Sequence, residues 1–513
     1  MLNAKFLLIR GFALTPTTRM PQSEKTRPPL SPHEVRSIIF GVMLAMFLAA
    51  LDQTIVATAM PTIGRALGDF ENLPWIVTTY LLTSTAVTPL YGKISDIAGR
   101  RLTLLVAIGI FVVGSILCAL APTMLTLILA RGLQGLGGGG LISLAQTIIA
   151  DIVSPKERPR YQAYIAGVFV TSSVAGPALG GFMAEKVHWS AIFWINLPLG
   201  LLALWMTNSL LKKLPRHEKP HRLDFLGAGL MIIATTALLL ALSLGGPHYA
   251  WTSAPILGLL GVFFLFAIAF IARLKTAPEP LIPLEILANK VVAMAIITAC
   301  SAVGVFIGLT IYTPIFLEGM YGLTASQSGF TLIPLMVGTV AGATLSGRLM
   351  ARIEHYKRPT MIGLAIAALG LAVVSLHPQG LPLIALAAIL TIASVGLGTV
   401  FPLTLVAIQN AVLPHQMGTA TGALNFFRSL GGALIVAAFG AIVIGSLPAD
   451  MAAHVTIETL ASSFTAAGGD IGSVFRWVLT AATTGLLVSL VSLYLMEERP
   501  LRTNAGPASQ AAE

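Results

Sequence analysis

The chain has 513 residues, of which 56% are hydrophobic and 10% carry a charged side chain. Soluble proteins contain about 25% charged residues, and no water-soluble fold could bury the apolar surface that a mean hydropathy of +0.85 implies. The composition therefore excludes a soluble protein and predicts one whose solvent is the lipid bilayer. The two cysteines, Cys118 and Cys300, lie in apolar stretches, which indicates neither a disulfide framework nor a thiolate metal site.

Apolar windows long enough to cross a membrane, about 20 residues, recur along almost the whole chain. They predict an all-α polytopic membrane protein with fourteen spanning helices. An even number of helices places both termini on the same side of the membrane. In chain order, the predicted helices cover residues 37–60, 73–92, 102–121, 123–149, 161–184, 190–211, 225–245, 254–273, 291–316, 327–349, 359–376, 381–406, 417–446 and 474–496.

Lysine and arginine residues predict which side this is, because short loops rich in them stay in the cytoplasm. With the N-terminus inside, the predicted outer segments contain only Arg65 and Lys186. Arg131, Arg428 and Arg476 fall within predicted helices, and all other basic residues lie in cytoplasmic segments. We therefore expect a multi-pass protein with both termini in the cytoplasm. This orientation accounts for the net charge of +10, so the charge indicates no nucleic-acid partner.

An acidic residue, Asp52, lies deep in the first predicted helix. It lies about 22 Å from the predicted cytoplasmic edge of that helix. A carboxylate at this depth costs at least about 2.5 kcal/mol, so such acids face the bundle interior and are functional by default. Asp52 is predicted to take up a proton in one conformation and release it in another, because burial and a nearby cation shift its pKa in opposite directions. The alternative is a hydrogen-bonding residue between helices.

The predicted turn between the second and third helices is the next polar segment. An acid in such a turn can cap a helix N-terminus and bind neighbouring arginines, so we expect a latch that depends on conformation. A similar segment at residues 347–352 has alanine in place of the acid, which suggests an internal repeat. The residues of the predicted latch are Gly92, Asp96, Gly99, Arg100 and Arg101.

Arg131 in the fourth predicted helix is the natural partner of Asp52. It lies ~12 Å below the outer edge of its helix, and Asp52 lies ~8 Å below the same edge. An ion pair, or a relay through Gln134, is compatible with these depths. Arg131 is therefore predicted to take part in proton coupling. A static brace is the alternative, since structural ion pairs also shift pKa values.

The fifth predicted helix carries Gly167, Gly176, Pro177, Gly180 and Gly181. Glycine lets another backbone come close, and proline frees a carbonyl group and bends the helix. This pattern favours a gate over a rigid strut, although glycine and proline are also common in ordinary spanning helices.

Together these motifs resemble the major facilitator superfamily and, within it, the fourteen-helix drug:proton antiporter family of the EmrB and QacA type. The resemblance covers roughly residues 35–500, nearly the whole chain. Four segments match motifs of helix 1, the following loop, helix 4 and helix 5, and two more resemble marks of the fourteen-helix branch. In that order, the segments are residues 51–61, 92–101, 131–139, 167–181, 189–200 and 222–227.

The resemblance implies a major facilitator fold of two six-helix bundles with two inserted helices. It implies an antiporter of the bacterial inner membrane that exports amphipathic drugs or toxic small molecules in exchange for protons, by alternating access and without a cofactor. The family also allows a periplasmic adaptor protein as partner. The expected divisions are a cytoplasmic tail at 1–36, the first bundle at 37–211, a linker with the inserted helices at 212–290, the second bundle at 291–496 and a cytoplasmic tail at 497–513.

Polar and aromatic residues on helices expected to line the central cavity are candidate substrate contacts. Because Asp52 is nearly alone among acids in the predicted membrane core, we expect poor export of divalent cations and better export of monocationic, neutral or weakly acidic amphipaths. The candidate contacts are Gln53, Trp75, Tyr80, Gln134, Gln146, Asn425 and Arg428.

Two charged residues depart from the family pattern. Glu318 stands where relatives often have glutamine, and it is either an exposed outer-loop acid, which we favour, or a further protonatable group. Arg428 lies about 16 Å into the thirteenth predicted helix. It could attract anionic or polar neutral substrates, or donate hydrogen bonds to carbonyl groups across the bundle.

Three other functions remain as alternatives. An exporter or flippase of a specific lipid or specialised metabolite would use the same scaffold, and so would a nutrient symporter. A membrane enzyme is a different class, and the sequence argues against it. The nine histidines are scattered over loops and helix ends, and no arrangement of an activated nucleophile is visible.

Overall fold

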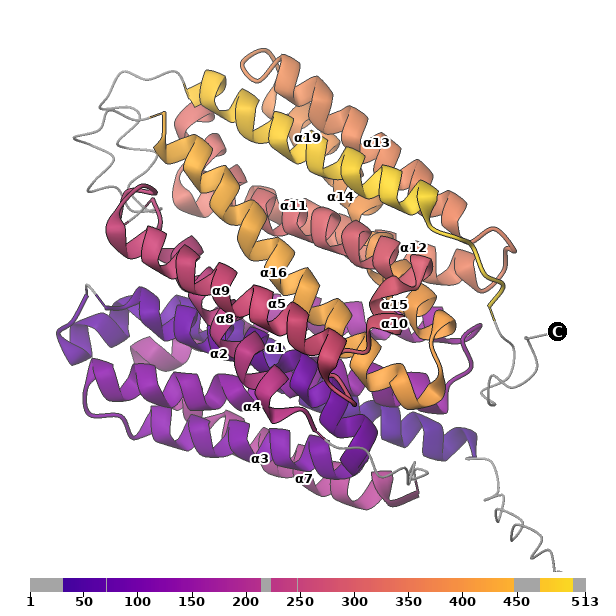
Figure 1. Ribbon diagram of the computed structural model, residues 1–513. Helices are drawn as coiled ribbons and strands as arrows, with labels where there is room; N and C mark the ends of the chain where they lie inside the picture. The colour runs from indigo at the N-terminus through magenta and orange to yellow at the C-terminus, as the bar shows by residue number, and fades with distance from the viewer. Residues whose placement is uncertain (1–30, 71, 214–222, 247, 447–470, 502–513) are drawn as a thin grey trace, which may run out of the picture.

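The computed structural model describes residues 31–70, 72–213, 223–246, 248–446 and 471–501, and these residues form helices (Figure 1). Among them no strand occurs, and the one β-bridge joins Gly245 to Tyr249. The prediction of an all-α fold is therefore confirmed. The predicted tails fall mostly outside the described residues, in the segments 1–30 and 502–513.

The helices follow the predicted order. α1 to α7 are Pro32–Leu67, Pro74–Ala98, Arg100–Ala119, Met124–Ile152, Arg158–Lys186, Ala191–Trp194 and Asn196–Leu210, followed by the 3-10 helix η1 at Leu211–Lys213. α8 to α12 are Phe225–Leu244, Ala254–Thr276, Leu284–Ala288, Lys290–Tyr321 and Ala325–Met350. α13 to α16 are Lys357–Leu376, Leu383–Gly398, Val400–Ala411 and Met417–Ile444, with the 3-10 helix η2 at Pro414–Gln416, and α19 is Ile471–Leu495.

Thirteen of these helices or continuous helix pairs, within the described segments, are long and apolar enough to cross a membrane. α2 is not among them, because its threonines and serines lower its hydropathy, but its 25 residues would extend about 37 Å. With α2 included, each of the fourteen predicted helices has a counterpart. The pairs α6–α7 and α14–α15 each correspond to one predicted helix.

Helix α1 begins at Pro32, before the predicted start at residue 37. The backbone N–H of Glu34 donates to Ser31 Oγ at 3.3 Å, and the backbone N–H of Ser31 donates to the Glu34 carboxylate at 2.9 Å. This capping box, with proline at the first helical position, sets the start of the helix. The helix thus begins five residues before its predicted start, because hydropathy does not register a polar cap.

Buried apolar side chains form separate clusters in the two halves of the chain. The largest cluster comes almost entirely from α10 to α19, and two others come from α1 to α7. Figure 1 shows these two groups of helices on opposite sides of the molecule. α1 begins and α19 ends at the same end of the bundle (Figure 1), which we call the terminal end. The exact residue limits of the predicted domains stay a prediction.

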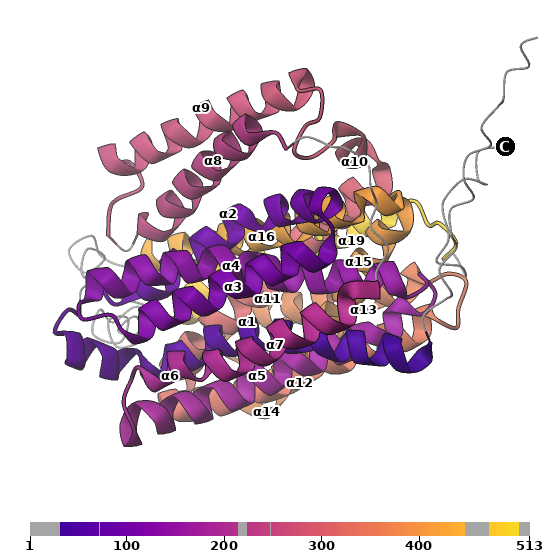
Figure 2. The ribbon, with the colours of Figure 1, turned by 90° about the horizontal axis from the view of Figure 1, so that it is seen from below.

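Helices α8 and α9 form a hairpin outside both groups (Figure 2). α8 packs on α2 and α16, where Ala228 and Met231 are buried together with Ala423. α9 packs mainly on α8 and leaves Phe264 and Leu265 exposed. Such apolar exposure suits a helix that faces lipid.

Helix α4 packs closely between α2 and α3 because of its glycines. A Cβ atom on Gly139 would lie 2.3 Å from the carbonyl oxygen of Ser84 in α2, and one on Gly137 would lie 2.4 Å from the backbone nitrogen of Phe111 in α3. Only glycine permits such an approach of backbones. The packing fixes α4, and with it Arg131, against its neighbours.

Candidate functional site

Asp52 lies in α1 and is completely buried. Arg131 of α4 is also buried, and its Nη1 donates to Asp52 Oδ2 at 2.6 Å. The structure thus joins the two residues in an ion pair, as their helix depths indicated. Removing one partner of a buried pair leaves an uncompensated charge, which costs about 3–5 kcal/mol.

Gln134, one turn after Arg131, bridges the pair. Its Nε2 donates to Asp52 Oδ1 at 2.8 Å, and its Oε1 accepts from Arg131 Nη1 at 2.7 Å. Arg131 also donates through Nε to the Ile76 carbonyl at 3.2 Å, and its guanidinium carbon lies 4.3 Å from the centre of the Tyr80 ring. Gln134 and Tyr80, suggested by the sequence as substrate contacts, are therefore buried beside the ion pair.

Asn196 at the start of α7 is a member of this site that the sequence analysis missed. It is fully buried, and its Nδ2 donates to Asp52 Oδ1 at 2.9 Å and to Ser115 Oγ at 3.0 Å. Its Oδ1 is enclosed and has no hydrogen-bond partner. An amide side chain inside an apolar span is costly unless it has a partner. An asparagine in the sixth predicted helix was therefore a signal in the sequence for this site. Asp52 therefore accepts hydrogen bonds from Arg131 and Gln134 of α4 and from Asn196 of α7.

We expect Asn196→Ala to lower the free energy of unfolding by about 1.5–3 kcal/mol, because a hydrogen bond to a charged group contributes about that much. The lost bond joins Asn196 Nδ2 to the fully buried carboxylate of Asp52. Thermal unfolding of the purified protein measures the loss. Asn72→Ala, which alters an exposed amide, is the control and should unfold at the temperature of the parent protein. Equal unfolding temperatures for Asn196→Ala and Asn72→Ala would show that the bond to Asp52 adds nothing to stability.

The second polar cluster lies at the terminal end of the bundle and centres on Asp96. Its Oδ1 accepts from the backbone N–H of Gly418 at 3.0 Å, and its Oδ2 accepts from the backbone N–H and the hydroxyl of Thr419, both at 2.7 Å. Gly418 and Thr419 are in the first turn of α16. The acid therefore caps a helix N-terminus, a favourable site for negative charge, and this helix belongs to the other half of the chain.

Arg100 also binds Asp96. Its Nη1 donates to Asp96 Oδ1 at 2.5 Å and to Ser95 Oγ at 2.7 Å. Its Nε donates to Asp151 Oδ2 at 2.7 Å. Asp151, in the last turn of α4, was missed by the sequence analysis, although an acid near the predicted end of a spanning helix was a visible signal. The guanidinium thus links the ends of α2 and α4 to the capped helix α16.

The remaining residues of the predicted latch have separate places. Gly92 and Asp96 are helical residues of α2, and the connection to α3 is the single residue Gly99, whose φ of 90° favours glycine. Arg101 Nη2 donates to Asn208 Oδ1 of α7 at 2.5 Å. The prediction of a loop is therefore wrong for most of the motif, because α2 extends to Ala98 and α3 begins at Arg100.

Helix α5 packs on α1 through part of its predicted glycine motif. A Cβ atom on Gly176 would lie 2.0 Å from Thr54 Oγ1, and one on Gly180 would lie 2.4 Å from the Ile55 carbonyl oxygen. In contrast, a Cβ on Gly167 or Gly181 would meet nothing within 4 Å. Pro177 is exposed. The expected close approach thus occurs at two of the glycines and lies within the first half of the chain.

Gln146 and Asn425, two of the predicted substrate contacts, join the halves instead. Asn425 Nδ2 donates to Gln146 Oε1 at 2.8 Å. Gln409 of α15, which the sequence analysis missed, donates to the Gln146 carbonyl at 3.4 Å and to Thr421 Oγ1 at 3.2 Å. These amides lie in the same half of the membrane span as the Asp96 cluster and add to the contact between α4 and α16.

Other predicted contacts lie elsewhere. Gln53 is exposed and Trp75 is half-buried near the start of α2. Glu318, favoured as an exposed outer-loop acid, is in the last turn of α11, half-buried, and accepts a hydrogen bond from Ser328 Oγ at 2.8 Å. The loop expectation is wrong because α11 continues to its C-cap at Gly322, where φ is 64°.

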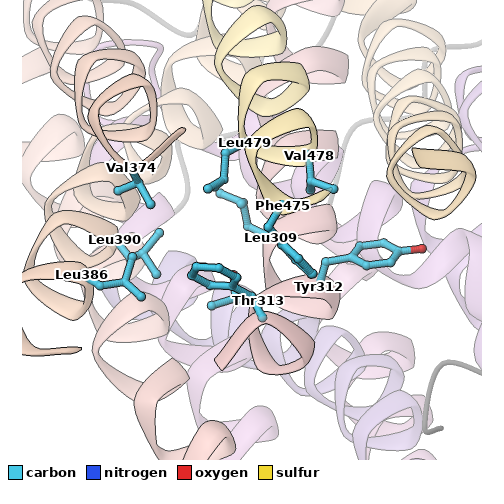
Figure 3. A pocket seen from close by; sticks show the side chains of 10 residues that line it. Leu309, Tyr312, Thr313, Val374, Leu386, Leu390, Phe475, Val478 and Leu479 are labelled. Carbon is cyan, nitrogen blue, oxygen red and sulfur yellow. The ribbon is translucent and has the colours of Figure 1, made fainter. Parts of the chain in front are cut away.

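A small pocket inside the second half is lined mostly by apolar side chains (Figure 3). Its one phenol, Tyr312, points its hydroxyl away from the other labelled side chains (Figure 3) and donates to the Val436 carbonyl at 3.3 Å. We therefore treat it as a packing defect and not as a substrate site. It is lined by Leu309, Tyr312, Thr313, Phe316, Val374, Leu386, Leu390, Phe475, Val478 and Leu479.

Comparison with known proteins gives concordant results. The Major Facilitator Superfamily model matches residues 42–436. The multidrug transporter protein MdtP of Bacillus subtilis is 32% identical over 90% of this chain and 85% of its own length. Multidrug resistance protein 3 of the same organism is 35% identical over 79% of each chain. Among solved structures, a bacterial homologue of the iron transporter ferroportin in an outward-facing state superimposes with a TM-score of 0.63 at 11% identity, covering 91% of this chain and all of that one.

Proposed function

Because the chain belongs to the major facilitator superfamily and is a membrane transporter and not an enzyme, we propose that it is a proton-coupled antiporter that exports amphipathic small molecules. Relatives that are multidrug proteins by name support drugs or toxic compounds as substrates. The antiport of protons is inferred from the buried site around Asp52. The assignment to the fourteen-helix antiporter family of the EmrB and QacA type, and a periplasmic adaptor, stay predictions.

The observation that carries the proposal is the fully buried Asp52 carboxylate with its paired arginine. Arginine does not deprotonate in proteins, so Asp52 is the member of the pair that can change its charge. Protonation of Asp52 neutralises it and removes its attraction to Arg131. A conformation that separates the two favours the protonated acid, whereas the closed pair favours the carboxylate. The site is therefore suited to couple proton binding to a change of conformation.

Antiport follows if the proton and the substrate stabilise different conformations. Contacts between the halves at the terminal end, through Asp96 and through Gln146, describe a state closed at that end. We assign the terminal end to the cytoplasm of a bacterial cell, from the distribution of lysine and arginine. Alternating access then requires these contacts to break so that substrate can enter, and a proton from outside resets the carrier.

The test is uphill transport in proteoliposomes with an imposed pH gradient. We expect fluorescent amphipathic drugs such as ethidium to accumulate against their gradient, and addition of drug to move protons in the opposite direction. A protonophore should abolish both signals, and liposomes without protein are the blank. Movement of proton and substrate in the same direction would replace the proposal by symport. No movement with any drug of the panel, but scrambling of labelled lipids, would replace it by a flippase.

A further inference from the structure

Arg428 of α16 carries a positive charge that no acid in the described part of the chain balances. It lies about 16 Å from the first residue of its helix, near the middle of a membrane-spanning segment, and is half-buried. Its Nη1 and Nη2 donate to Asn425 Oδ1 and Thr404 Oγ1, both at 3.4 Å. Its Nε is enclosed and has no hydrogen-bond partner.

Two other buried arginines have different surroundings. Arg131 and Arg100 contact carboxylates at 2.6 and 2.5 Å, respectively. No aspartate or glutamate of the described segments forms an ion pair with Arg428. Its two hydrogen bonds are longer than the usual 2.7–3.2 Å or so of an N–H donor and an oxygen acceptor. Nor does it bond to carbonyl groups across the bundle, which was the structural alternative. The donors of Arg428 are thus largely unused.

A charge inside a membrane span without a counter-charge is costly and is normally retained for a function. Because Asp52 and Arg131 neutralise each other, Arg428 is left with a net positive charge at mid-membrane depth. We infer that Arg428 binds the anionic group of the exported molecule, and that the substrates include amphipathic monoanions such as aryl carboxylates and phenolates. This inference rests on the proposed export function and names a substrate class for it.

The surroundings of Arg428 suit an aromatic acid. Its guanidinium carbon lies 5.3 Å from the centre of the Phe401 ring, and Phe306 packs edge-on against Phe401 with ring centres 6.2 Å apart. Both rings are half-buried, so each keeps some accessible surface beside Arg428. A guanidinium can hold a carboxylate through two parallel hydrogen bonds, while the rings contact the apolar body.

The same arginine is linked to the contact between the halves through one intermediate residue, Asn425. Arg428 donates to Asn425, and Asn425 donates to Gln146 of α4. An anion that accepts a hydrogen bond from Arg428 Nη1 would replace the bond to Asn425 Oδ1. The Asn425 side chain is then held less firmly in its contact with Gln146. Binding of the anion therefore changes the stability of the closed terminal end, as an antiporter requires.

The test compares two molecules of the same shape and different charge, 1-naphthaleneacetate and its neutral amide, 1-naphthaleneacetamide. Equilibrium binding of each radiolabelled compound to the full-length protein in nanodiscs is measured by dialysis at pH 7, with empty nanodiscs as blank. We expect the intact protein to bind the acid roughly 10- to 100-fold more tightly than the amide. The preference should disappear in Arg428→Gln and persist in part in Arg428→Lys. Arg476→Gln removes an exposed arginine of α19 and should keep the full preference.

Equal affinities of the intact protein for acid and amide, including no measurable binding of either, would overturn the inference, and this result needs no variant to fold. A preference that survives in Arg428→Gln would also overturn it, since another group would then hold the anion. The binding ratio requires no proton gradient. It therefore remains measurable if antiport fails, whereas a ratio of one leaves proton-coupled export of neutral or cationic drugs possible.

Discussion

Replacement of Asp52 by asparagine is expected to abolish uphill export while the protein still folds and still exchanges substrate across the membrane. Asparagine has the shape of the protonated acid, and its single carbonyl oxygen can still accept a hydrogen bond from Arg131, while its NH2 group takes the place of the oxygen that accepts from Gln134. It cannot bind or release a proton at any physiological pH. Transport then loses its link to the pH gradient, and the accumulation ratio of the drug should fall to about one, the equilibrium value without coupling.

The cost to stability should be moderate because the substitution leaves Arg131 as a buried cation without its carboxylate. The arginine keeps its contacts with Gln134 and the Ile76 carbonyl, which limits the loss to less than the about 3–5 kcal/mol of a fully broken buried pair. Thermal unfolding of the purified variant measures this. A folded variant that exchanges labelled drug but does not accumulate it would identify Asp52 as the coupling group.

Glu318→Gln is the matched control for Asp52→Asn. Glu318 is also a helical acid with a hydrogen-bond partner, but it is half-buried at the end of α11 opposite the terminal end. We expect this variant to retain proton-driven accumulation. If Asp52→Asn still accumulates drug and Glu318→Gln does not, the coupling site lies at the outer end of the second half, and the role assigned to the buried pair is wrong.

Replacement of Gly92 by alanine is expected to open the terminal end of the bundle. A Cβ atom on Gly92 would lie 2.4 Å from the Gly418 carbonyl oxygen and 2.9 Å from its carbonyl carbon. Both atoms belong to the backbone of α16, so no side-chain rotation can relieve the contact, and α2 and α16 must separate. Overpacking typically costs about 1–3 kcal/mol, which would raise the population of the open state roughly 5- to 150-fold.

The opening can be measured as the rate at which a water-soluble maleimide labels a cysteine at Thr421, a fully buried position of α16. The natural thiols of Cys118 and Cys300 are first replaced by alanine. We expect faster labelling in Gly92→Ala than in the parent protein. Gly109→Ala is the control, because a Cβ there meets nothing within 4 Å. Equal labelling rates in both variants would mean that the contact between Gly92 and Gly418 does not hold this end closed.

The sequence alone was sufficient for the positions of the helices, because each must cover the bilayer with apolar residues regardless of its neighbours. It was also sufficient for Asp52 and Arg131, since charge at mid-membrane depth is rare and costly. The predicted positions of the helix ends were less accurate. Ser31 and Gly322 set them through local capping and a left-handed backbone, for which hydropathy has no signal.

Only the tertiary structure could identify the other partners of the buried acids. Asn196 is 144 residues from Asp52 in the chain, and Gly418 is 322 residues from Asp96, so neither contact follows from a local pattern. The roles of Gln146 and Asn425 depended in the same way on which helix faces meet. Composition and periodicity thus determined that this chain is a helical membrane protein with a buried charged site. The packing of α1, α4, α7 and α16 decided which donors surround each charge, because a hydrogen bond depends on distance and direction between side chains and not on their separation in sequence.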